Sequence, residues 1–335
     1  MRFLLPCLAL VAACHGGSGS DSDSDSTDTT DPTDTDTNTA VTGDTGEATL
    51  WVEQAFLAPE SKAEDIVFVV DNSCSMSDNQ RDLASTMEGF VATLDGGGID
   101  WRVGVTSTDV DGNYGNPLEG RLVQDNGTVG VSAGTPDAAT LIREQLQLGV
   151  DGSGEEKGIL AVYMALGLHG DGANASFFRD HAGFHVVVVS DEDDQSDASR
   201  PELITLPEFV NWMVGVRPNT SSVSFSSLVC TEETIACSSL GTRYMEVSES
   251  IGGIVADIHQ PLEPVTLAIA AAVVAGSGLR SLVLDEVPAD PDTLEVLVDG
   301  VLLDPAEWSF DETSNTVVLV DAAPDGAEVV VRFPA

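Results

Sequence analysis

The chain carries two kinds of hydrophobic pattern, which meet near residue 277 of its 335 residues. Before that point, short apolar runs alternate with segments of helical spacing. Runs rich in β-branched residues predict strands, and apolar residues three to four apart predict helices. The strands are expected at 66–70, Trp101–Ser107, Phe184–Val189 and Ser222–Val229, and the helices at 83–94, 135–148, Glu155–Leu168, Pro207–Val216 and Pro264–Ala275. This alternation indicates an α/β domain over 48–276: a doubly wound, mostly parallel sheet with helices on both faces.

The segment 279–335 has a different pattern, because helical spacing gives way to short strands separated by turn residues. Asp299-Gly300 lies between two apolar runs and is a strong hairpin signal. We expect a small all-β, sandwich-like domain with strands at Leu282–Leu284, Leu294–Val298, Thr316–Val320 and Val329–Phe333.

The first strand ends at a carboxylate, and two hydroxyls follow at alternate positions: Asp71, Ser73 and Ser75. Ligands of open α/β sheets bind at the carboxyl ends of the strands. Oxygen side chains are the donors that hard divalent cations prefer. The pattern therefore predicts half of a metal site, although a plain strand-to-helix turn with Ser75 as helix cap is an alternative.

The stretch Asp71-Asn72-Ser73-Cys74-Ser75 resembles the metal-ion-dependent adhesion site of von Willebrand factor A domains, whose signature is Asp-x-Ser-x-Ser. The resemblance implies two further ligands. Asp191, which follows the strand ending at Val189, matches the family's last aspartate. Ser153, in a glycine-rich loop, stands where the family has a threonine. Glu155 and Glu156 are alternatives to Ser153, which is also placed to cap the following helix.

The resemblance also implies a function. A Mg²⁺ ion, or Ca²⁺ or Mn²⁺ in its place, would keep one position open for an acidic residue of a protein partner, in adhesion or assembly. Two other classes stay open: a structural envelope protein whose metal only stabilises the fold, and a metal-dependent hydrolase. We expect no enzyme, because phosphoryl chemistry normally needs a lysine and none follows Lys157.

The composition is strongly acidic, with 56 Asp and Glu against 13 Lys and Arg and a net charge of −43. This charge argues against a nucleic-acid partner, because a phosphate backbone is bound by Lys and Arg.

Residues 1–13 are expected to be a signal peptide, and Val11-Ala12-Ala13-Cys14 resembles a bacterial lipobox, which implies lipidation of Cys14. An ordinary secretory signal is the alternative. Residues 14–47 are nearly all Ser, Asp, Thr and Gly and predict a disordered tether. We therefore expect an exported protein that reaches a membrane only through its lipid anchor, at the outer membrane or cell surface.

Three cysteines remain in the predicted domains, which suits an exported protein. Cys230 and Cys237 follow one apolar run and are expected to close a short loop by a disulfide. Cys74 then stays single, and we interpret it as a spacer between two metal ligands.

Overall fold

The protein was analysed as a computed structural model, which describes residues 50–58, 62–111, 117–196, 205–217, 222–233, 237 and 239–335. The predicted signal peptide at 1–13, Cys14 and the tether at 14–47 lie outside these residues. Within the described part of the chain, no helix combines the length and the apolar character that a membrane crossing requires.

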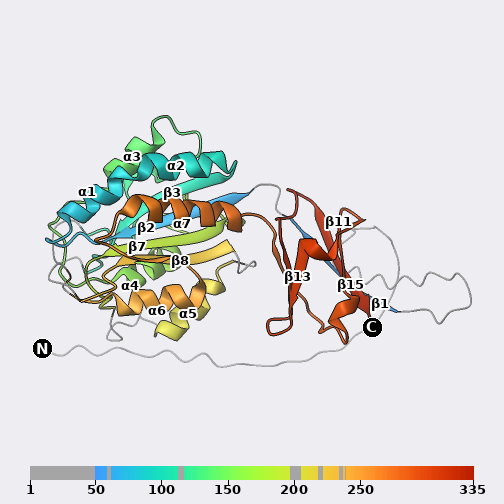
Figure 1. Cartoon of the computed structure of the whole chain (residues 1–335). Coiled ribbons are helices and arrows are strands. Elements are labelled where there is room, and N and C mark those ends of the chain that lie inside the picture. Colours follow the sequence, from blue (N-terminus) through green and yellow to red (C-terminus); the bar gives the residue numbers. More distant parts are fainter. Residues whose placement is uncertain are drawn as a thin grey trace, which may run out of the picture. The chain divides into compact units, whose positions relative to one another are not determined.

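The α/β domain, which we call the head domain, is built on a six-stranded sheet in the order β6-β3-β2-β7-β8-β9 (Figure 1). Neighbouring strands are parallel, except that β6 runs antiparallel to β3. The strands are β2 (Ala63–Val70), β3 (Asp100–Ser107), β6 (Val131–Ser132), β7 (Gly183–Ser190), β8 (Val223–Val229) and β9 (Val255–Asp257), and β4 (Gln124–Asp125) pairs with β5 (Thr128–Val129) apart from this sheet. The predicted α/β, mostly parallel architecture is confirmed.

Helices cover both faces of the head sheet, as Figure 1 shows. Side chains alternate between the faces of a strand, so Phe68 and Val70 of β2 enter one core cluster while Val67 and Val69 enter the other. The first face is covered by α1 (Ser77–Ser85), α2 (Met87–Gly96), α3 (Ala138–Leu146) and α7 (Leu262–Gly276), and the second by α4 (Gly158–Tyr163), α5 (Leu206–Val214) and α6 (Thr242–Ile251). Because β2 and β7 are buried along their whole length on both faces, each contains a continuous apolar run, at 66–70 and 186–189.

Three helices differ from the prediction. The single helix expected at 83–94 is two helices, α1 and α2, that meet at Thr86. The helix expected from Glu155 begins at Gly158 and continues from Met164 to Leu168 as a π-helix (η1). It starts late because the backbone of Lys157, its N-cap, is not helical, with φ −128° and ψ 52°. Helix α6 was not predicted.

The β module consists of two antiparallel sheets, β1-β15-β11-β12 and β10-β14-β13, around one apolar core. Its elements are β1 (Trp51–Leu57), β10 (Ser281–Val283), β11 (Glu295–Val298), β12 (Val301–Leu302), β13 (Trp308–Asp311), β14 (Thr316–Leu319) and β15 (Glu328–Pro334), with short 3₁₀ turns η3 (Pro291–Thr293) and η4 (Pro305–Glu307). The predicted hairpin at Asp299-Gly300 joins β11 to β12, and both residues have the positive φ that this turn requires.

Strand β1 corrects the predicted domain boundary. The prediction assigned residues 48–276 to the head, but β1 pairs residue by residue with β15 of the β module, from Trp51 opposite Pro334 to Leu57 opposite Glu328. Every second residue of β1 is exposed, while β2 is buried throughout. Alternating burial is typical of an antiparallel sheet with one wet face, and full burial of a central parallel strand. The β module is therefore built from both sides of the head in the sequence.

Candidate metal centre

The candidate site lies where the direction of the chain across the sheet reverses. From β2 the chain proceeds to β3 and β6 on one side, and then returns to β7 on the other side of β2. Open α/β sheets bind ligands at such a point, outside the carboxyl ends of the strands. Here the carboxyl ends of β2 and β7 carry Asp71 and Asp191, and the N–H of Asp71 donates to the carbonyl oxygen of Val189 at 2.9 Å.

Four of the five predicted ligands meet at this point. Asp71 is fully buried, and its Oδ1 accepts the N–H of Ser73 at 2.7 Å. The hydroxyls of Ser73 and Ser75 lie 3.2 Å apart, and Ser75 Oγ donates to Asp191 Oδ1 at 3.1 Å. Residues 120 positions apart in the chain thus share one hydrogen-bonded group of oxygen atoms.

The fifth predicted ligand, Ser153, is buried in a loop that contacts the backbone of Asn72. Its loop is anchored by the N–H of Gly152, which donates to the carbonyl oxygen of Asn72 at 2.9 Å. A side chain at residue 152 would collide with Asn72, because an added Cβ would lie 2.4 Å from its amide. The N–H of Ser153 donates to Asp109 Oδ2 at 3.2 Å, and its Oγ accepts the N–H of Glu155 at 3.0 Å. The serine thus has the contacts of a cap for its own loop, and its role as a ligand stays a prediction.

The two alternatives to Ser153 are in different environments. Glu155 has 65% of its side chain exposed and forms an ion pair with Lys157 at 3.0 Å. Glu156 is completely buried, accepts a hydrogen bond from the hydroxyl of Thr108, and lies beside Asp71. Of these two glutamates, Glu156 is therefore the one that faces the candidate site.

Two further residues brace the site and were missed in the sequence. Ser190, the last residue of β7, donates its hydroxyl to Asp71 Oδ2 at 2.7 Å. Gln80, buried on α1, donates its amide to the carbonyl oxygens of Asp71 at 2.8 Å and Gly149 at 2.9 Å. The position of Ser190, next to Asp191 at the end of a strand, could have indicated its role from the sequence. Nothing around Gln80 distinguishes it from other helical residues.

The four consecutive acids at 191–194 do not all belong to the site. Asp193 Oδ1 accepts the N–H of Arg243 at the start of α6 at 2.8 Å. Asp194 is buried and accepts the N–H of Ile159 at the start of α4 at 3.0 Å and Nε of Arg243 at 3.1 Å. Carboxylates at helix N-termini satisfy N–H groups that have no partner within the helix. These two acids therefore position helices. Of the other two, Glu192 accepts from the Gln195 amide at 3.3 Å, and Asp191 accepts from Ser75 in the candidate site.

The electrostatics of the site favour a bound cation. Burial, joined by the nearby charge of Asp191, raises the pKa of Asp71 from 3.8 to about 6. Burial and then the charge of Asp71 raise the pKa of Glu156 from 4.5 to about 9. Buried acids in mutual contact carry either protons or a counter-ion. Because the surrounding donors are carboxylate and hydroxyl oxygens, the residues present fit a hard divalent cation.

A loop on the rim contains Asp109 and Asp111, whose spacing resembles the start of a calcium loop. Both carboxylates have protein partners: Asp109 accepts from Ser153, and Asp111 forms an ion pair with Lys157. Residues 112–116 lie outside the described part of the chain. The described partners make this loop a support for the 151–157 segment.

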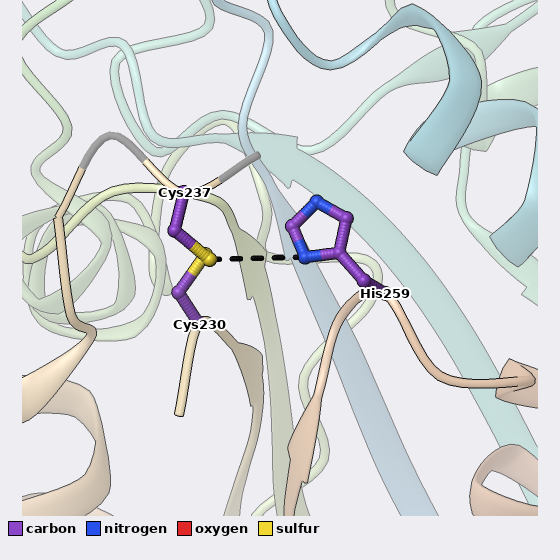
Figure 2. A group of neighbouring side chains, drawn as sticks. All are labelled: Cys230, Cys237 and His259. Carbon is purple, nitrogen blue, oxygen red and sulfur yellow. Dashed lines mark hydrogen bonds between the residues drawn. A yellow bond between two sulfur atoms is a disulfide. The ribbon is translucent and has the colours of Figure 1, made fainter. Parts of the chain in front are cut away.

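Cys230 and Cys237 form the expected disulfide, at the carboxyl end of β8 (Figure 2). Cys230 Sγ lies 3.5 Å from the carbonyl oxygen of Asp191, and Cys237 Sγ lies 3.8 Å from His259 Nδ1. Two sulfurs and an imidazole could be taken for a zinc site. Thiolates are the sulfur ligands of zinc, and a disulfide has none. The pair therefore fixes the end of β8 beside Asp191. Cys74, by contrast, is a free and exposed thiol.

The sequence matches no protein-family model and no curated protein. Among solved structures, the pilus adhesin SpaC from Lactobacillus rhamnosus GG aligns with a TM-score of 0.45 and 12% identity, over 87% of this chain and 45% of the adhesin. A von Willebrand factor type A protein from Catenulispora acidiphila aligns with a TM-score of 0.40 and 14% identity, over 84% of this chain and 65% of that one. The chain thus spans less than two thirds of either protein.

The strand order and the position of the Asp-x-Ser-x-Ser loop define the class of the head domain. Its chain reversal lies between β2 and β7, and Asp71, Ser73 and Ser75 follow β2 at that point. In these two features the head resembles von Willebrand factor A domains, and a separate antiparallel β module accompanies it.

Proposed function

We propose that this chain is a cell-surface protein whose head binds a protein partner through a divalent cation, in adhesion or assembly. The cation is Mg²⁺, or Ca²⁺ or Mn²⁺, and Asp71, Ser73, Ser75 and Asp191 hold it directly or through water. The observation that supports this most is the meeting of those four oxygen side chains at the switch point of the sheet. An acidic side chain of the partner would complete the coordination.

The proposed role is binding rather than catalysis. Histidine is the side chain most often used as a general base at neutral pH. His185 lies near the amino end of β7, whereas Asp191 follows its carboxyl end, and the imidazole is occupied by Glu64 at 2.7 Å and Ser224 at 2.8 Å. The cation would then serve to join two proteins. Lipidation of Cys14 and the tether at 14–47 would hold the head away from a bacterial outer membrane or cell surface.

Calorimetric titration of Mg²⁺ and Ca²⁺ into the full-length protein tests the metal site. Asp71→Asn is the blank, because it removes one buried carboxylate and leaves the acidic tether unchanged. We expect one saturable site in the parent protein that is missing in the variant. Equal heats from both proteins would refute the site.

Partner binding is tested separately by pull-down from cell envelopes. Retention of a partner should be lost in EDTA, restored by added Mg²⁺, and lost again in Ser73→Ala. If retention is unchanged by EDTA and by Ser73→Ala while the cation still binds, the second candidate applies, in which the cation only stabilises the fold. The burial of Glu156 beside Asp71 is the observation that keeps this second candidate open.

A further inference from the structure

We propose that Glu156 is an internal ligand of the cation, occupying the position that an acidic side chain from a partner would otherwise take. The inference rests on the proposed metal site and concerns how that site is controlled. A partner would then bind only by displacing Glu156, so the site is closed by the chain's own carboxylate.

The backbone around Glu156 is fixed on two sides. Its carbonyl oxygen accepts the N–H of Gln195, which is in the segment that follows Asp191, at 2.5 Å. The N–H of the next residue, Lys157, donates to the carbonyl oxygen of Thr108 at the end of β3. The backbone of Glu156 is therefore held by the loops after β3 and β7.

The Glu156 carboxylate is only half satisfied. Oε2 accepts from Thr108, but Oε1 is buried and has no hydrogen-bond donor among the described residues. Glu156 also lies beside Asp71, whose own two oxygens accept from Ser73 and Ser190. A buried carboxylate oxygen without a donor is costly. A cation held by Asp71 would give Oε1 a partner.

The ligand set then contains three carboxylates: Asp71, Asp191 and Glu156. Three negative charges exceed the charge of one divalent cation, so the ion would attract a further anionic ligand only weakly. The affinity of Ca²⁺ sites rises with the number of charged ligands. A site with this charge should bind its cation firmly and resist an outside carboxylate for as long as Glu156 stays in place.

The sharpest test counts the water molecules on the bound ion. Tb³⁺ serves as a luminescent substitute for Ca²⁺, and its emission lifetimes in H₂O and D₂O give the number of bound waters. Full-length protein is compared with Glu156→Gln, after subtraction of the Asp71→Asn blank. Glu155→Gln is the matched control, because it makes the same chemical change at the adjacent, largely exposed position.

We expect Glu156→Gln to gain about one bound water and to lose at least about tenfold in cation affinity, while Glu155→Gln changes neither. Added acetate should remove the extra water in Glu156→Gln and should have no effect on the parent protein. Glu156→Asp, which withdraws the carboxylate by one methylene, replaces Glu156→Gln if the latter does not fold.

Equal water counts and affinities in the parent protein and Glu156→Gln would overturn the inference and leave Glu156 as a protonated hydrogen-bond donor to Asp71. That result would leave the proposed metal site intact. A parent protein that gives no more signal than Asp71→Asn would instead overturn the metal site itself, and the inference with it.

Discussion

The protein without metal should lose stability as the pH rises through the neutral range, and Glu156 should be the cause. Its pKa is about 9 in the folded protein and 4.5 as the unperturbed value. Between these values the folded state holds a proton that the unfolded state has released. Stability falls with rising pH wherever the folded state binds more protons. The stabilisation that the proton on Glu156 provides is complete below the pKa of this residue in the unfolded chain. It is lost as the pH rises through the pKa of Glu156 in the folded protein.

The size of the effect follows from one proton. The free energy of unfolding changes by about 1.4 kcal/mol per pH unit for each proton of difference. From about pH 6.5 to about pH 8 the loss is therefore about 2 kcal/mol. A domain of this size melts about 2–4 °C lower for each kcal/mol, so Tm should fall by about 4–8 °C over that interval.

The measurement is thermal unfolding of the full-length protein in EDTA at several pH values. Glu156→Gln should lose this pH dependence and be more stable than the parent at about pH 8. Glu155→Gln, the control, should keep it. Saturating Ca²⁺ should also remove it from the parent, because the cation then takes the place of the proton. A pH dependence that persists in Glu156→Gln would refute the reasoning.

Three further experiments test the supports of the fold and the site. Gly152→Ala should weaken cation binding in calorimetry, because the added Cβ would lie 2.4 Å from the Asn72 amide. Gly154→Ala, where the added Cβ meets open space, should leave cation binding unchanged. Equal effects of the two variants would contradict the geometry. Arg179→Ala should cost about 3–5 kcal/mol in denaturant unfolding, because fully buried Asp65 loses its ion pair, while Arg81→Ala at an exposed pair should cost less than about 1 kcal/mol. Similar losses in these two arginine variants would refute the role of burial. Reduction of the Cys230–Cys237 disulfide should cost about 2–3 kcal/mol for a loop of this length, measured as a lower Tm in the Cys74→Ser background, and an unchanged Tm would show that the bond contributes nothing.

The sequence was sufficient to predict those strands whose burial on both faces produces a continuous apolar run. The strands β2 and β7 are covered on both faces, so their apolar runs were evident and the residues that follow them were obvious candidates for ligands. Asp71, Ser73 and Ser75 were named on that basis and Asp191 from the family resemblance, and the structure brings the four together. Ser153 was named from the family resemblance, and its described contacts are within its own loop and with Asp109.

The choice between Glu155 and Glu156 could not be made from the sequence. The two residues are adjacent and chemically identical, and only the contacts of the 151–157 loop decide which one turns inward. The acids at 193 and 194 present the same difficulty, because the helices that they cap start far away in the sequence. Side-chain direction in a loop depends on partners that have no local signature.

The sequence by itself determined the α/β class of the head, the all-β class of the C-terminal segment, and the loops that carry the candidate ligands. Only the tertiary structure decided that β1 belongs with β15, that Ser190 and Gln80 brace Asp71, and that Glu156 completes a buried group of acids. The physical reason is the range of the interactions. Hydrophobic periodicity is set by each segment's own burial, whereas strand pairing and charge clustering depend on residues that the chain brings together only when it folds.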